Sequence, residues 1–131
     1  MQGHRISVIS VPVRDPAVAK AFYVEVLGFE VLMDEQFGDD LRWVMLRPPG
    51  CETAVTLTTW YESMPPGTLA GTVLSVPDID AAVAELRGHG VLDDDDEIES
   101  APWGRSVAIE DPDGNRWIVQ QDNPLPIRFD Q

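Results

Sequence analysis

Histidine and cysteine, which hold transition metals and act as catalytic bases or nucleophiles, are scarce in this sequence. There are two histidines, His4 and His89, and one cysteine, Cys51. A single cysteine excludes a cysteine-rich zinc site and an internal disulfide. No histidine lies beside Cys51 in the sequence, so we expect a passive thiol there. No glycine-rich phosphate loop, dinucleotide-binding fingerprint or serine nucleophile elbow is present.

Four tryptophans could bind a ligand by stacking, because indole rings are flat apolar surfaces on which other rings stack. They are Trp43, Trp60, Trp103 and Trp117. A ligand pocket combines such walls with a few polar anchors. Each indole could equally belong to a core or to a contact between subunits, where aromatic side chains are also favoured. Both interpretations stay open at this point.

The negative charge of the chain excludes several classes of partner. The 131 residues carry 9 basic and 23 acidic side chains, which gives a net charge of −14 at pH 7. This charge repels nucleic acids and anionic membranes and favours cationic ligands. The sequence contains neither a bilayer-spanning segment nor the apolar core of a secretory signal. We therefore expect a cytoplasmic protein that binds neither nucleic acid nor membrane.

The pattern of the first half predicts a strand, a helix and three further strands. The first strand is the β-branched run at 5–13. Asp15 is suited to cap the helix that follows, with Pro16 at its first position and Gly28 just past its end. The three further strand-like runs lie at 29–35, 41–47 and 53–60. This half therefore has the order βαβββ.

The same order recurs in the second half. Asp78 corresponds to Asp15 and can cap a second helix, which glycines end at 88 and 90. The strand-like runs of this half lie at 70–76, about 97–99, 105–110 and 116–121. Neither half alone would bury much core. We expect one domain, 1–131, made of modules at 5–61 and 69–122 with a C-terminal tail at 123–131.

Three stretches carry a resemblance to a known family. They are VPVRDPAVAKAFYVEVLGFEV, SVPDIDAAVAEL and APWGRSVAIEDPDGNRWIVQQ. In this order and spacing they resemble the vicinal oxygen chelate superfamily, which includes glyoxalase I, bleomycin-resistance proteins and extradiol dioxygenases. The resemblance implies an α+β fold in which two βαβββ modules form a curved mixed sheet with a cleft. It also implies a homodimer, since relatives commonly build each cleft from both subunits.

Catalytic relatives hold a divalent metal in this cleft through four side chains, usually His and Glu. The equivalent positions of this sequence are Val8, Thr56, Gly71 and Ile118. None is an imidazole or a carboxylate, and only Thr56 has a side-chain oxygen. The resemblance therefore implies no metal, no cofactor and no catalytic residue of the family type. A displaced metal site that uses His4 and Glu52 is the alternative, while solvated surface groups are the simpler interpretation of both.

A cleft without metal resembles the drug-sequestering members of the superfamily, which bind ligands between subunits without chemistry. Strand alternation places Trp60 on one face with Thr56 and Thr58, and Gln120 on one face with Ile118. A large indole on a loop, as at Trp103, often has a functional role. Trp117 has the opposite parity and should lie under a helix. The candidate ligand-binding residues are Trp60, Trp103, Thr56, Thr58, Gln120 and Trp43.

The favoured hypothesis is metal-independent binding of a small molecule, planar or cationic, such as a drug or toxin. One alternative is a metal-dependent lyase, isomerase or dioxygenase with non-standard ligands. A second is a metal-free enzyme that uses Glu110, Tyr61 or Cys51 as acid or base. A third is an interaction module that keeps the fold for dimerisation. The sequence does not identify the ligand.

Overall fold

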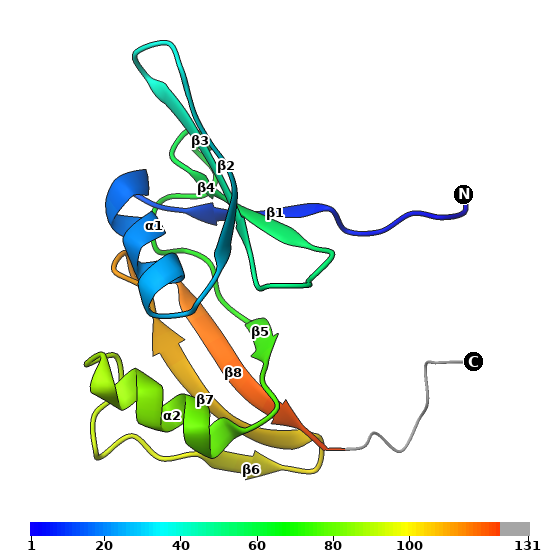
Figure 1. The fold of residues 1–131 in the computed structure, drawn as a ribbon, viewed down its shortest axis with the longest axis vertical. Coiled ribbons are helices and arrows are strands. Elements are labelled where there is room, and N and C mark those ends of the chain that lie inside the picture. The colour runs from blue at the N-terminus through cyan, green and yellow to red at the C-terminus, as the bar shows by residue number, and fades with distance from the viewer. Residues whose placement is uncertain (124–131) are drawn as a thin grey trace. The chain divides into compact units, whose positions relative to one another are not determined.

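The computed structural model describes residues 1–123 as two four-stranded mixed sheets with one helix packed on each (Figure 1). The chain divides into two compact units. Unit 1 comprises Met1–Leu69 and Asp111–Asn115, and unit 2 comprises Ala70–Glu110 and the described residues from Arg116 onward. The predicted tail at 123–131 lies outside the described residues, apart from Asn123.

The sheet of unit 1 has the strand order β1-β4-β3-β2, in which β1 is parallel to β4 and the other pairs are antiparallel. Its elements are β1 (Val8–Pro12), α1 (Pro16–Glu25), β2 (Glu30–Phe37), β3 (Leu41–Arg47) and β4 (Ala54–Thr58). Helix α1 contacts β3 and β4. Leu46, Leu57 and Tyr23 are fully buried, so the core of this unit lies between the helix and the middle strands.

The residues that begin and end α1 have the roles that the sequence predicts. The Asp15 carboxylate accepts a hydrogen bond from the backbone N–H of Ala17 at 2.9 Å, and Pro16 is the first helical residue. This cap satisfies one of the N–H groups that a helix leaves unpaired at its start. After the helix, Gly28 has a φ of +73°, a conformation that glycine adopts without steric cost.

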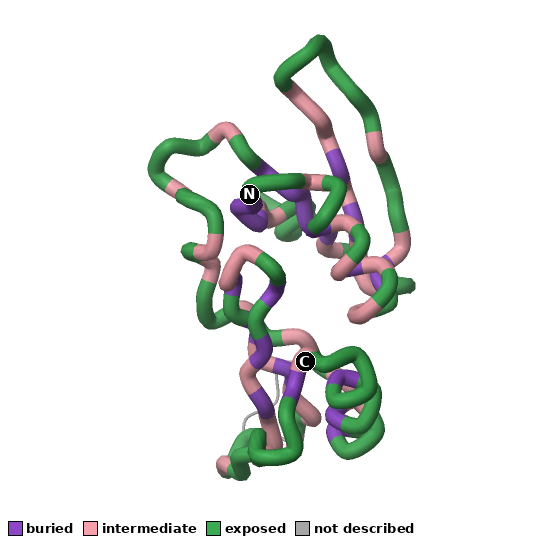
Figure 2. Tube along the Cα trace, turned by 90° about the vertical axis from the view of Figure 1, so that its left-hand side faces the viewer, coloured by how far each residue is buried: buried purple, intermediate pink, exposed green. Residues whose placement is uncertain are grey.

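Unit 2 repeats the arrangement with the strand order β5-β8-β7-β6. Its elements are β5 (Thr72–Ser75), α2 (Ile79–Gly88), β6 (Glu99–Ala101), β7 (Gly104–Glu110) and β8 (Arg116–Asp122). Asp78 caps α2 through the N–H of Ala81 at 3.2 Å. Figure 2 shows buried positions recurring along α2 between exposed ones, the pattern of a helix with one face on a sheet.

The turn between β7 and β8, residues 111–115, belongs to unit 1. Asp111 is buried and accepts hydrogen bonds from the Tyr23 hydroxyl at 2.7 Å and from the Asn115 side chain at 2.8 Å. The Asn115 amide also donates to the carbonyl of Pro12 at 2.8 Å. The DPDGN sequence therefore forms a tight turn whose polar side chains complete the interior of unit 1.

The structure confirms the α+β class, the two βαβββ modules and every predicted element, but it moves some boundaries. The first strand was expected at 5–13 and spans Val8–Pro12, because its pairing with β4 runs only from Val8–Ala54 to Pro12–Thr58. The second strand of the second module was expected at about 97–99 and spans Glu99–Ala101, because its partners in β7 are residues 104–106. Within residues 1–123, no helix is long and apolar enough to cross a membrane.

Candidate functional site

The face of the unit 1 sheet opposite α1 carries most of the candidate residues. Val44 and Leu46 of β3 and Leu57 of β4 are buried on the side that α1 covers. Side chains alternate along a strand, so Trp43 and Thr56 point to the opposite face. Their strands are adjacent there, since Met45 pairs directly with Thr56. We refer to this side as the open face of unit 1.

Two predicted indoles meet on the open face. The ring centroids of Trp43 and Trp60 lie 5.6 Å apart with an interplanar angle of 22°, which is a stacked arrangement. Tyr61 extends the group, with its ring centroid 5.9 Å from that of Trp60, and it is about half exposed. Trp43, Trp60 and Tyr61 form what we call the aromatic cluster. Its rings offer a flat apolar surface on which a planar molecule can stack.

Two threonines lie on the same strand face as the cluster. Thr56 and Thr58 are each only 2% exposed. The Thr58 hydroxyl oxygen is enclosed, and no hydrogen-bond partner for it exists within residues 1–123. A buried polar atom without a partner is rare in folded proteins and usually has a functional explanation. The structure therefore brings four of the six predicted residues together on one side of unit 1, namely Trp43, Trp60, Thr56 and Thr58.

A carboxylate that the sequence analysis missed also lies on the open face. Glu35 of β2 is the direct cross-strand partner of Trp43 of β3. Its neighbour Asp34 points to the other face, where it contacts Lys20 of α1. The alternation along β2 could have placed Glu35 on the open face. Its position opposite Trp43 follows from the hairpin register, which pairs Phe37 with Leu41 beside the turn.

The other two predicted residues belong to unit 2. Gln120 lies in β8, and its side-chain amide donates to the Asp122 carboxylate at 2.7 Å. The Ser75 hydroxyl donates to the second oxygen of the same carboxylate at 3.0 Å. Trp103 lies in the turn between β6 and β7 and is 56% exposed. Gln120 thus sits in an exposed polar network, and Trp103 is an indole open to solvent.

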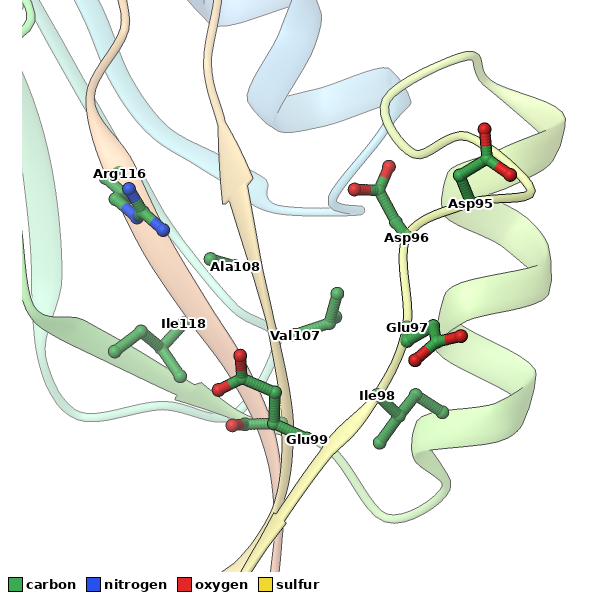
Figure 3. A pocket seen from close by; sticks show the side chains of 10 residues that line it. Asp95, Asp96, Glu97, Ile98, Glu99, Val107, Ala108, Arg116 and Ile118 are labelled. Carbon is green, nitrogen blue, oxygen red and sulfur yellow. The ribbon is translucent and has the colours of Figure 1, made fainter.

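Unit 2 also contains a cavity of about 530 Å³ (Figure 3). Ile118, one of the four family ligand positions, lines it together with Arg116 from the same strand. Carboxylates from β6 and the loop before it line the other side, namely Asp95, Asp96, Glu97 and Glu99. These carboxylates are exposed, as expected for a solvated acidic loop, and they also form one wall of this cavity.

The family ligand positions do not fit a metal ion. Val8 and Ile118 have hydrocarbon side chains and Gly71 has none. The one oxygen donor, on Thr56, is a neutral hydroxyl on a buried residue. Within residues 1–123, no group of three or more His, Cys, Asp or Glu side chains could hold a metal. The donor set of the catalytic relatives is therefore not present at these positions.

The most perturbed carboxylate of unit 1 lies away from the aromatic cluster. Hydrogen bonds from Arg42, at 2.8 and 2.9 Å, and from Lys20, at 2.7 Å, hold the pKa of Asp34 far below its ordinary value. In unit 2 the bidentate contact with Arg105 likewise lowers the pKa of Asp80. Both carboxylates are matched by cations, so their role is structural.

Comparisons with known proteins agree with this architecture. A family model described as the Glyoxalase/Bleomycin resistance protein/Dioxygenase superfamily matches residues 5–119. The crystal structure of TnmS3, an antibiotic binding protein from Streptomyces sp. CB03234, is similar at 41% identity and a TM-score of 0.86, covering 94% of this chain and 99% of that one. A glyoxalase/bleomycin resistance protein from the same organism is 42% identical with a TM-score of 0.78, covering 89% and 100%. The uncharacterized protein YetH of Bacillus subtilis (strain 168) is 28% identical over 122 residues, covering 89% and 98%.

Proposed function

The chain belongs to the glyoxalase/bleomycin resistance protein/dioxygenase superfamily, and from this premise we propose that it binds a small planar molecule, such as a drug or toxin, without chemistry. The observation that carries the proposal is the stacked pair Trp43 and Trp60 on the open face of unit 1. The similarity to an antibiotic binding protein at 41% identity supports it. Fold membership alone would not, because one fold hosts many activities.

The proposed contacts have distinct roles. Trp43 and Trp60 stack on the ligand, and Thr56 and Thr58 lie beside them on the same strand face. Trp103 and Gln120, in unit 2, are proposed separately as ligand contacts of that unit, the first by stacking and the second by hydrogen bonding. The net charge of −14 favours a cationic ligand over an anionic one.

Binding is proposed to be independent of metal. The four family ligand positions offer a metal one neutral oxygen and no imidazole, thiolate or carboxylate. A metal-dependent lyase, isomerase or dioxygenase would have to take its ligands from other positions. We further propose a cytoplasmic homodimer, on the family resemblance for the assembly and on the sequence for the location.

Tryptophan fluorescence tests the proposed function directly. Planar tricyclic probes, 9-aminoacridine and acridine, should quench the emission and bind measurably by calorimetry. Trp60→Ala and Trp43→Ala should each weaken binding about tenfold, because one stacking contact contributes about 1–3 kcal/mol. Val18→Ala is the control, since this exposed residue lies on α1 and outside the aromatic cluster. No binding of either probe to the wild type, or wild-type affinity in both tryptophan variants, would overturn the proposal.

A further inference from the structure

Glu35 places an uncompensated negative charge beside the aromatic cluster. Directly paired residues on adjacent antiparallel strands have Cβ atoms about 5 Å apart, so the Glu35 side chain lies within reach of a molecule stacked on Trp43. Both arginines of β3 are engaged elsewhere, Arg42 with Asp34 and Arg47 with Glu30. Within residues 1–123 no cation pairs with Glu35, and a cationic ligand would supply the missing charge.

Thr58 places an unused hydrogen-bonding group beside the same rings. It precedes Trp60 by two residues and is only 2% exposed. Its hydroxyl oxygen can accept hydrogen bonds, yet no partner occurs within residues 1–123. Leaving such a group unsatisfied destabilises a fold, so a threonine here is best explained by a partner that arrives with the ligand.

We infer that the aromatic cluster takes a planar aromatic cation bearing N–H donors, with Glu35 selecting the charge and Thr58 accepting a hydrogen bond. The inference rests on the proposed function and adds the chemical class of its ligand. Tryptophan is the aromatic residue that attracts cations most strongly, so Trp43 and Trp60 serve the same selection. A cation held over an indole and beside a carboxylate is attracted by both groups.

Access to the Thr58 hydroxyl requires a side chain to move, since the oxygen is enclosed in the free protein. Trp60 lies beyond Thr58, the last residue of β4, on backbone outside the sheet, and its indole is only partly buried. A shift of this indole as the ligand stacks on the aromatic cluster would open a path to the hydroxyl. The Thr58 hydroxyl is thus enclosed in the free protein and becomes accessible only when the ligand binds.

A matched pair of probes separates this inference from the proposed function. At mildly alkaline pH, 9-aminoacridine is a planar cation with N–H donors, and acridine is a neutral ring system of the same size without them. The wild type should bind 9-aminoacridine at least about tenfold more tightly than acridine, as expected for an added charge interaction. Equal affinities would leave the planar-ligand site standing and overturn the selection of cations.

Glu35→Gln tests the charge. It should weaken 9-aminoacridine binding about fivefold, and more at low ionic strength, and leave acridine binding unchanged. Glu25→Gln is the matched control, because it removes the same charge from an exposed position on α1. An equal effect of both variants would mean that the overall charge of the protein is responsible, and would overturn the role of Glu35.

Thr58→Val tests the hydroxyl through two readouts of opposite sign. Removing an unsatisfied buried hydroxyl should raise Tm, and the same change should weaken 9-aminoacridine binding without affecting acridine. Thr53→Val is the matched control, because the Thr53 hydroxyl donates to the carbonyl of Ile6 at 2.8 Å. That variant should lower Tm and leave both affinities unchanged. A lower Tm in Thr58→Val, or unchanged binding of 9-aminoacridine, would overturn the role of Thr58.

Discussion

Individual buried polar residues of unit 1 differ in whether their hydrogen bonds are satisfied. The Asp111 carboxylate accepts from the Tyr23 hydroxyl, the Asn115 side chain and two backbone N–H groups of its own turn. The Thr58 hydroxyl has no partner within residues 1–123. Because networks of buried polar groups stabilise a fold only when they are complete, the Asp111 network should contribute to stability, and the open valence of Thr58 agrees with its proposed role in binding.

Tyr23→Phe should therefore destabilise the protein without affecting ligand binding. The variant removes a buried 2.7 Å hydrogen bond to a carboxylate and keeps the ring in place, so the free energy of unfolding should fall by about 1.5–3 kcal/mol. Tyr61→Phe is the control for stability, because the Tyr61 side chain is about half exposed. Urea denaturation measures both variants. Equal stability of Tyr23→Phe and the wild type would contradict the importance of this bond.

At the level of secondary structure, three charged residues connect α1 to the β2–β3 hairpin. Lys20 of α1 and Arg42 of β3 both donate to the Asp34 carboxylate of β2. Their side chains are between a fifth and a third exposed, so solvent screens the interaction only in part. The cluster ties the helix to the strand pair that carries Trp43 and Glu35, and so helps to hold the open face in position.

This cluster makes stability depend on pH in the acid range. The pKa of Asp34 is lowered in the folded protein, so its contribution is fully present above the ordinary Asp pKa of about 3.9 and is lost as the pH falls below it. Asp34→Asn should lower the free energy of unfolding by about 1 kcal/mol at neutral pH, with the difference from wild type shrinking progressively below about pH 4.

Thermal denaturation across this pH range measures the effect. Asp39→Asn, at an exposed position between β2 and β3, is the matched control and should follow the wild type throughout. A wild-type advantage over Asp34→Asn that stays constant down to the lowest pH would show that the Asp34 carboxylate is not the titrating group.

The elements of this protein could be predicted from local signals, whereas only part of the candidate site could be. Asp15 and Asp78 cap their helices through contacts within three residues, which a sequence displays directly. Alternation also predicted that Trp117 is buried, and it is 2% exposed. The stacking of Trp43 on Trp60 brings β3 together with the segment that follows β4, and alternation along either strand alone does not predict this contact.

Other features of the site depend on tertiary structure alone. Whether the Thr58 hydroxyl has a hydrogen-bond partner depends on every residue packed around it, and no sequence pattern shows this. Glu35 joins the site only because the β2–β3 hairpin brings it opposite Trp43, which in turn stacks on Trp60. Likewise, the acidic residues before β6 line a cavity only because Arg116 and Ile118 of β8 form its opposite side. Such contacts arise between segments that are distant in the sequence.

At the level of the whole molecule, the family resemblance predicts the assembly state, and the missing family ligands predict the metal content. Native mass spectrometry of the purified protein should give a homodimer without a stoichiometric transition metal, because the four family positions offer one neutral oxygen. The same preparation after incubation with excess zinc or manganese serves as the control and should return to the metal-free mass on desalting. About one metal ion per chain that survives desalting would contradict metal independence, and a monomer would contradict the assembly.

Unit 1 takes five of its residues, Asp111–Asn115, from a point more than 40 positions beyond its main segment, which ends at Leu69. Severing the chain near Gly67 would thus yield an N-terminal fragment whose Tyr23 hydroxyl has lost its acceptor and whose Pro12 carbonyl has lost a donor. Unit 1 therefore includes residues from both repeats. An N-terminal fragment that ends near Gly67 should be less stable than unit 1 of the full chain, unless the segment that carries Asp111–Asn115 is supplied with it.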